Sequence, residues 1–178
     1  MLDVRGKQSL FLCLLLLSSQ LIAGTTSKTF QVSAVITGGC ALGNGSAGNN
    51  DTQFGTINFG ERSSIPSNID VASSNGAGSL IVTCTPGIGV SISLDYGLNG
   101  GNSSARYLIN GSGSRKLAYQ LYKDAGHSNI WGMGAQANTI ASFPDGSRIF
   151  TVYARLFSVS SPPPAGIYTD TVTVTLTY

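Results

Sequence analysis

The sequence predicts an all-β protein, and three observations support this fold class. Apolar and polar residues alternate along several short segments, as they do in strands with one buried face. Runs rich in Gly, Ser and Asn separate these segments at the spacing typical of a sandwich. No stretch has a convincing 3.6-residue period, and charged residues, which helices favour, make up only 10% of the chain. An immunoglobulin-like β-sandwich fits this pattern best.

The N-terminus has the layout of a secretory signal peptide. Arg5 and Lys7 precede a short apolar run, and small residues follow at Ala23 and Gly24. The apolar run is far shorter than the roughly 20 residues that a membrane-spanning helix needs. We therefore expect residues 1–24 to be cleaved off during export, and the mature chain to have no transmembrane segment.

The cysteines predict one disulfide. Cys13 lies in the signal peptide and is discarded with it, which leaves Cys40 and Cys84. An even pair in an exported chain most simply forms a disulfide, worth about 4 kcal/mol for a loop of this length. A metal site is the rival, but His127 is the single histidine and no CxxC motif occurs. We predict no metal and no cofactor.

The first strand is expected over residues 30–37, where apolar residues occupy every second position. A Gly-Gly pair ends this strand, and the Gly-, Asn- and Ser-rich residues 41–52 predict a flexible loop. Further strands are expected over residues 54–59, 80–84, 90–96, 117–122 and 150–156. Residues 97–114 predict a loop with a short apolar break at 107–109. The apolar face of the first strand consists of Phe30, Val32, Ala34 and Ile36.

The last strand has the clearest pattern in the sequence. From Asp170 the chain reads DTVTVTLTY, with threonines on one face. At one end of the chain, a loop separates the first strand from the domain. At the other end, the last strand has nothing beyond it to pair with. Together these features suggest strand addition between molecules. The alternative is that the first strand folds back into its own domain, and the residues alone leave both open. The apolar face of the last strand consists of Val172, Val174, Leu176 and Tyr178.

No motif predicts catalysis. Residues 43–48 match GxGxxG by letters, but no helix follows, as a dinucleotide site would require. His127 lies in a turn, where we expect a solvated surface group, and no GxSxG motif accompanies it. Acidic residues are scattered along the chain, and we expect Trp131 to fill the core rather than bind a sugar. The net charge of +2 shows no clustering, so nothing favours nucleic-acid binding.

The order of several short motifs resembles the spore coat protein U domain family, the pilins of archaic, Csu-type chaperone–usher pili. The resemblance covers essentially the whole mature chain. The matching pieces, in order, are FQVSAVITGGC, FGTINFG, LIVTC, YQLYKD, PAGIYTD and TVTVTLTY.

The resemblance implies an incomplete immunoglobulin-like sandwich that lacks its last strand. Residues 25–39 would be an N-terminal donor-strand extension and residues 40–178 the pilin domain. Donation would use Phe30, Val32, Ala34 and Ile36. The acceptor groove and chaperone contact would use Val172, Val174, Leu176 and Tyr178.

The resemblance also implies a function and partners. The chain would be a structural pilus subunit, not an enzyme, that polymerises by donor-strand complementation and supports surface attachment or biofilm. A periplasmic chaperone, an outer-membrane usher and neighbouring pilins would be its partners, and a cell-surface pilus reached through the periplasm its location. The alternative is a secreted β-sandwich adhesin or a carbohydrate-binding module.

Overall fold

The fold was analysed in a computed structural model that describes residues 24–43, 54–111, 113 and 115–178. Residues 36–178 form one compact unit, and the preceding residues are considered by themselves. The predicted signal peptide up to residue 23, Cys13 and most of the GxGxxG stretch lie outside the described residues. Within the described part, no helix is long and apolar enough to cross a membrane.

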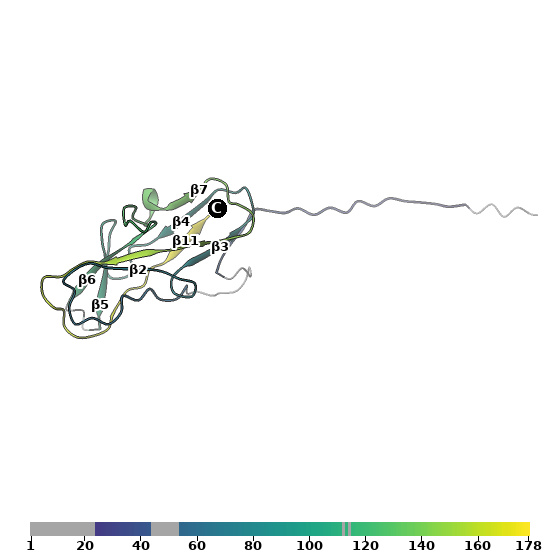
Figure 1. Ribbon diagram of the computed structural model, residues 1–178. Coiled ribbons are helices and arrows are strands. Elements are labelled where there is room, and N and C mark those ends of the chain that lie inside the picture. Colours follow the sequence, from purple (N-terminus) through teal and green to yellow (C-terminus); the bar gives the residue numbers. More distant parts are fainter. Residues whose placement is uncertain (1–23, 44–53, 112, 114) are drawn as a thin grey trace, which may run out of the picture. The chain divides into compact units, whose positions relative to one another are not determined.

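The described chain is built from strands and one short 3₁₀ turn, with no α-helix among the described residues (Figure 1). Most strands are three to five residues long, and those over residues 80–84 and 90–94 alternate fully buried and partly buried positions, as half-buried strands do. The elements are β1 (Cys40–Leu42), β2 (Ile69–Ala72), β3 (Leu80–Cys84), β4 (Val90–Leu94), β5 (Arg106–Asn110), β6 (Lys116–Tyr122), η1 (Gly134–Gln136), β7 (Asn138–Ile140), β8 (Ser147–Phe150), β9 (Tyr153–Leu156), β10 (Tyr168–Thr169) and β11 (Val174–Thr177).

The strands form three hydrogen-bonded sheets, and every pair of named strands is antiparallel. Their orders are β1-β3-β8, β11-β4-β7 and β10-β5-β6-β9-β2. Figure 1 shows β11, in yellow, alongside β4. The sheets pack around a single hydrophobic cluster, so the predicted all-β sandwich is confirmed.

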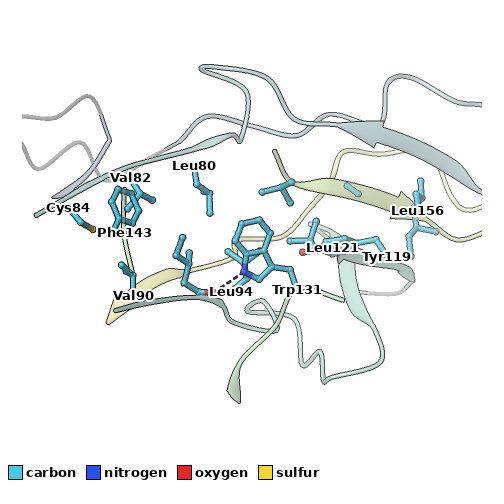
Figure 2. Packing of buried hydrophobic residues seen from close by; sticks show 14 of the residues in the cluster. Leu80, Val82, Cys84, Val90, Leu94, Tyr119, Leu121, Trp131, Phe143 and Leu156 are labelled. Carbon is cyan, nitrogen blue, oxygen red and sulfur yellow. Dashed lines mark hydrogen bonds between the residues drawn. The ribbon is translucent and has the colours of Figure 1, made fainter. Parts of the chain in front are cut away.

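Two fully buried aromatic residues belong to this cluster (Figure 2). Trp131 is 1% exposed, and its indole Nε1 donates a hydrogen bond of 2.9 Å to the carbonyl of Ile92 on β4. Phe143, also 1% exposed, lies in the loop between β7 and β8. The expectation that Trp131 fills the core is therefore confirmed, since a buried indole needs a partner for its N–H and has one.

Residues 54–59 do not form the predicted strand. Gly55 has a φ of 93°, which an extended strand cannot contain, and a Cβ there would lie 2.0 Å from the carbonyl oxygen of Gly76. The segment pairs through a single bridge between Gly55 and Ala77. Its large apolar side chains still pack against the core. The apolar pattern therefore predicted the burial of this segment correctly, but not its backbone conformation.

The predicted strand over residues 150–156 is two strands in two sheets. β8 pairs with β3, whereas β9 pairs with β6 and β2. The chain changes sheets at Thr151 and Val152, where Val152 N donates 2.8 Å to Ser73 Oγ and its carbonyl accepts from Ser73 N at 2.8 Å. Continuous alternation hid the change because both sheets bury their side chains in the same core.

Two stretches predicted as loop are partly strand. The apolar break at 107–109 is the middle of β5, which pairs with β6 and β10. The start of the expected loop, Ala41 and Leu42, belongs to β1, which pairs with β3. Tertiary pairing extends both elements into sequence that is locally rich in Gly and Asn.

The predicted first strand, over residues 30–37, is not paired with any strand in this structure. Every residue from 24 to 38 is exposed, and the exposed fractions of Phe30, Val32 and Ile36 are 86%, 82% and 87%. The prediction of a formed strand is wrong here, because an extended segment becomes a strand only beside a partner edge. Its use as a donor stays a prediction.

Candidate functional site

Of the six strands that end the three described sheets, β1 and β11 are the two whose residues meet at an apolar groove. β1 is paired with β3 alone, and β11 is paired with β4 alone, among the strands that the structure describes. The outer edge of each therefore presents backbone N–H and C=O groups that no described strand satisfies. Such edges can accept a further strand.

An open, largely apolar groove of about 700 Å³ lies in the sandwich and is lined by residues of both edge strands. β1 contributes Leu42, and the segment leading into β11, together with its first residue, contributes Val172 and Val174. Central strands supply its floor, so a side chain entering the groove would contact the hydrophobic core directly. The apolar floor residues are Leu80, Leu94, Leu108, Leu121, Val152 and Ala154.

The irregular segment 54–59 forms one wall of the groove. Phe54, Ile57 and Phe59 line it and pack against the core. Phe59 meets the ring of Tyr119 edge-on, with ring centroids 6.3 Å apart. A Cβ at Gly78 would lie 2.4 Å from Ile57, so this wall approaches the chain before β3 as closely as glycine permits.

One end of the groove is polar. Tyr119 OH donates a hydrogen bond of 2.7 Å to Asp170 Oδ2, and both residues line the groove. Asp170 Oδ1 accepts from the backbone N–H of Leu98 at 3.0 Å and of Thr171 at 2.9 Å. Burial, and then the bond to Asp170, raise the pKa of the Tyr119 phenol well above its usual range. The carboxylate thus fixes the start of the segment that leads into β11.

A second carboxylate fixes the same segment two residues further on. Asp95 Oδ1 accepts from Thr173 N at 2.9 Å and from Gly97 N at 3.0 Å, and Asp95 N donates to the carbonyl of Thr173 at 3.0 Å. A Cβ at Gly97, whose φ is 79°, would lie 2.0 Å from Asp170 Oδ2. The turn after β4 therefore clamps the wall of the groove and requires glycine at this position.

Beneath this turn lies a fully buried arginine. Arg106 donates to the backbone carbonyls of Asp95 at 2.8 Å and of Trp131 at 2.8 Å, and to the side chain of Gln120. Its exposed fraction is 0%, and burial lowers the pKa of its guanidinium. Arg106 on β5 thereby joins two of the sheets at the polar end of the groove, since Asp95 directly follows β4.

The core at the disulfide end is filled by a loop. Phe143, between β7 and β8, donates its N–H to the carbonyl of Ile88 and accepts from Gly87 N, both at 2.8 Å. Figure 2 shows its ring in the part of the core that contains Val82 and Val90. Phe143 does not line the apolar groove, so the groove lies in another part of the core.

The predicted disulfide is present. Cys40 and Cys84 are bonded and lie directly opposite each other in the β1–β3 register. The adjoining residue, Gly39, is held to Thr85 by three hydrogen bonds. Its N–H donates to Thr85 Oγ1 at 3.1 Å, and its carbonyl accepts from Thr85 N at 2.9 Å and from Thr85 Oγ1 at 3.3 Å. The edge strand β1 is therefore firmly attached at the point where the N-terminal segment meets the domain.

The predicted groove residues on the last strand are placed unevenly. Val172 and Val174 line the groove, and Leu176 packs against the core without lining it. Tyr178 is 63% exposed. Their proposed contact with a donor or a chaperone stays a prediction. The lining residues on β3, β5 and β6 were missed, since ordinary core alternation marks them and only the open edge distinguishes them.

His127 is not the solvated group that its turn suggested. Its side chain is 7% exposed, and its ring meets Tyr122 edge-on, with centroids 5.0 Å apart. Nδ1 lies 3.2 Å from Arg155 Nη2, and Nε2 lies 3.7 Å from Asp70 Oδ1. A φ of 55° folds the turn back so that the ring covers the sheet. Within the described ranges, no group of three or more His, Cys, Asp or Glu could hold a metal ion.

The fold and the groove define the class of protein: an immunoglobulin-like sandwich left open between two strand edges. Residues 26–175 match the Spore Coat Protein U domain, and the chain belongs to that family. It is 29% identical over 168 residues to Protein U of Myxococcus xanthus, covering 88% of this chain and 87% of that protein.

A solved structure shares the fold. It is a pre-assembly complex of the chaperone CsuC and the tip adhesion subunit CsuE, from the archaic chaperone–usher Csu pili of Acinetobacter baumannii. The TM-score is 0.53 at 18% identity. The match covers 80% of this chain but 40% of the matched chain, so the likeness concerns the fold of one part of that protein.

Proposed function

We propose that this chain is a structural subunit of an archaic chaperone–usher pilus that polymerises by donor-strand complementation. The observation that carries the proposal is the apolar groove between the free edges of β1 and β11. Residues 25–39 act as the donor extension and residues 40–178 as the accepting domain. The fibre supports surface attachment or biofilm, and the subunit has no catalytic role.

The chemistry of the N-terminal segment supports this role. Phe30, Val32 and Ile36 are more than four-fifths exposed, and with Ala34 they occupy alternate positions. Moving a water-exposed apolar stripe of this kind into an apolar groove is thermodynamically favourable. Burying four such side chains contributes on the order of 6–12 kcal/mol as an upper figure, and ladder hydrogen bonds to both free edges add to it.

The same groove explains the proposed partners. Before assembly an empty groove exposes core residues, so a periplasmic chaperone lends a strand until an outer-membrane usher exchanges it for the donor of the next subunit. Family membership and the fold shared with a chaperone-bound tip subunit support this route. It implies export through the periplasm to a cell-surface pilus.

The test uses two complementary variants of the mature chain. Val32→Arg with Ile36→Arg puts charges on the donor stripe, and Val174→Arg puts one in the groove, so neither chain alone should form long fibres. Mixed together, they should form a one-to-one dimer, because the intact donor of the second fits the intact groove of the first. Size exclusion with light scattering, and electron microscopy, measure both results.

Matched controls place the same charges on the opposite faces. Gln31→Arg with Ser33→Arg, and Thr175→Arg, should leave fibre formation intact, since these residues alternate with the apolar positions and lie on the polar face. Long fibres from the Val32/Ile36 variant, or no dimer in the mixture, would contradict the proposal. A stable wild-type monomer that binds glycans saturably would favour the secreted adhesin or carbohydrate-binding module instead.

A further inference from the structure

We propose a second contact between neighbouring subunits, which rests on the proposed function. In it, the β3–β4 turn of the donating copy, around Pro86, docks beside Leu98 of the accepting copy. The partner is therefore another copy of this chain, or a pilin with the same turn. Three features carry the inference: a linker without slack, a donor register, and an exposed apolar spot at the position which that register selects.

The linker between donor and domain is one residue long. Gly39 is held to Thr85 by three hydrogen bonds, and Cys40 begins β1. Within the proposed donor extension, only Gly38 therefore separates the end of the alternating stretch, Thr37, from Gly39, which is held to the domain. One residue spans at most about 3.6 Å, so the body of the donating copy must touch the end of the groove that its donor leaves.

The faces of the two segments select a register. All pairs of named strands in this fold are antiparallel, and we take the donor to pair with β11 in the same way. Apolar faces meet only when even-numbered positions oppose each other. One such register matches all four apolar positions: Ile36 opposite Val172, Ala34 opposite Val174, Val32 opposite Leu176 and Phe30 opposite Tyr178.

The neighbouring registers fit less well. A shift of two residues in one direction sets Ile36 against Asp170, whose carboxylate is already bonded to Tyr119, and buries an apolar side chain against charge. A shift in the other direction sets Gly38 against Val172 and leaves that side chain uncovered. The matched register instead sets Gly38 against Asp170, at the polar end of the groove.

The surface next to Asp170 is open and mixes polar residues with the exposed apolar side chain of Leu98. Asp170 holds the backbone N–H of Leu98, whose side chain is 75% exposed. Leu98, Ile109 and Asn99 line a shallow hollow of about 430 Å³ there, which adjoins the main groove because Asp170 and Thr171 line both. In the matched register the donor ends beside this side chain, so the body of the donating copy would cover it and remove its apolar surface from water.

The donating copy brings a complementary end. Gly38 lies against Ile88, since a Cβ at Gly38 would be 3.2 Å from Ile88 Cγ2. Pro86 and Gly87 are exposed in the same turn, which carries no charged residue. Pro86 precedes β4 and Leu98 follows it, so the two lie at opposite ends of that strand. The contact is therefore head to tail and repeats along the fibre.

Disulfide trapping tests the contact in full-length fibres. The variant Pro86→Cys with Leu98→Cys should give a ladder of covalent multimers on oxidation. The two sites are separated by the roughly 17 Å of a five-residue strand, so no bond can form within one copy. Pro86→Cys with Ile149→Cys, which uses an exposed residue of β8, should give no ladder. Pro86→Cys alone tests the opposite polarity, because a parallel donor would bring like ends together.

Fibres that form normally but give no ladder with the Pro86/Leu98 pair would overturn the inference while leaving the proposed function intact. Covalent dimers from Pro86→Cys alone would overturn it too. Absence of any fibre from the wild-type chain would instead contradict the proposed function.

A labelled peptide of residues 29–37 separates the contact from the groove. The acceptor is the full chain with Val32→Arg and Ile36→Arg, which cannot donate. Adding Leu98→Gln should change the affinity for the peptide by less than about twofold, because the peptide has no body to dock. The same Leu98→Gln change in an otherwise wild-type fibre should speed dissociation of subunits about tenfold. Equal effects in both assays, or none in the fibre, would contradict the contact.

Discussion

The phenol of Tyr119 donates a 2.7 Å hydrogen bond to the carboxylate of Asp170, and this pair closes one end of an otherwise apolar groove. Asp170 also accepts two backbone N–H groups, so one side chain ties β6, the turn after β4 and the entry to β11 together. The position of the groove wall therefore depends on a polar contact as well as on packing.

Removing that contact should weaken the fold without abolishing it. We expect Tyr119→Phe to lower the free energy of unfolding by about 1.5–3 kcal/mol, the usual worth of a hydrogen bond to a charged group. Urea denaturation measures the change. Tyr107→Phe is the control, because its ring lies on the outer face of the same sheet under Lys116 and should matter little. Equal losses from both variants would contradict the role of the Asp170 contact.

Alkaline pH should destabilise the fold through the same phenol. The pKa of Tyr119 is raised in the folded state by burial and by Asp170, so the folded state holds this proton more tightly. Its contribution is complete below the unfolded pKa of about 10 and is lost as the pH rises above that value. Tyr119→Phe should flatten the fall in stability above about pH 10. Burial also raises the pKa of Tyr122, so some dependence should remain. An unchanged pH profile in the variant would contradict this assignment.

The disulfide should make a large contribution to the free energy of unfolding for a single bond. Cys40 and Cys84 are 44 residues apart in sequence, and on the chain-entropy account the bond stabilises the fold by about 4 kcal/mol. Replacing both cysteines with serine should lower the free energy of unfolding by that order in urea. Reduction of the wild-type chain should give a similar loss. A loss below about 1 kcal/mol would show that the register of β1 survives on its backbone bonds alone.

His127 should matter for stability and not for assembly. Its buried ring packs against Tyr122, so His127→Ala should cost about 1–2 kcal/mol in urea denaturation. His127→Asn should cost less than alanine, because asparagine tolerates the positive φ of this turn better. Fibre formation should be unchanged in both. A variant as stable as the wild type would return His127 to the solvated role that the sequence suggested.

The sequence predicts the fold well where local pattern and tertiary pairing agree. β3, β4, β6 and β11 lie within or close to strands expected from alternation, and the cysteine pair is joined as expected. β5 was missed because Gly and Asn flank it and because its first residue, Arg106, is charged. The burial of Arg106 depends on hydrogen bonds to the carbonyls of residues distant in sequence, which no local pattern reveals.

The candidate site is less visible in the sequence. Val172 and Val174 could be named as groove residues because they share the apolar face of the last strand. Leu42, Leu94 and Leu108 could not, since they come from separate strands whose alternation is the same as that of an ordinary core. The open part of the core lies where the sandwich lacks a strand. A sequence pattern shows the strands that are present, and it shows a lacking strand only indirectly.

The bond between Cys40 and Cys84 has a mechanical consequence for a fibre built as proposed. Tension along such a fibre enters each subunit at Gly38 and reaches β1, a strand of three residues. If backbone hydrogen bonds alone held so short a strand, tension could break them one after another. The disulfide instead transfers the load from Cys40, the first residue of β1, to β3. This strand is the middle one of its sheet and is hydrogen-bonded on both sides. The subunit is therefore reinforced at the point where pulling force arrives.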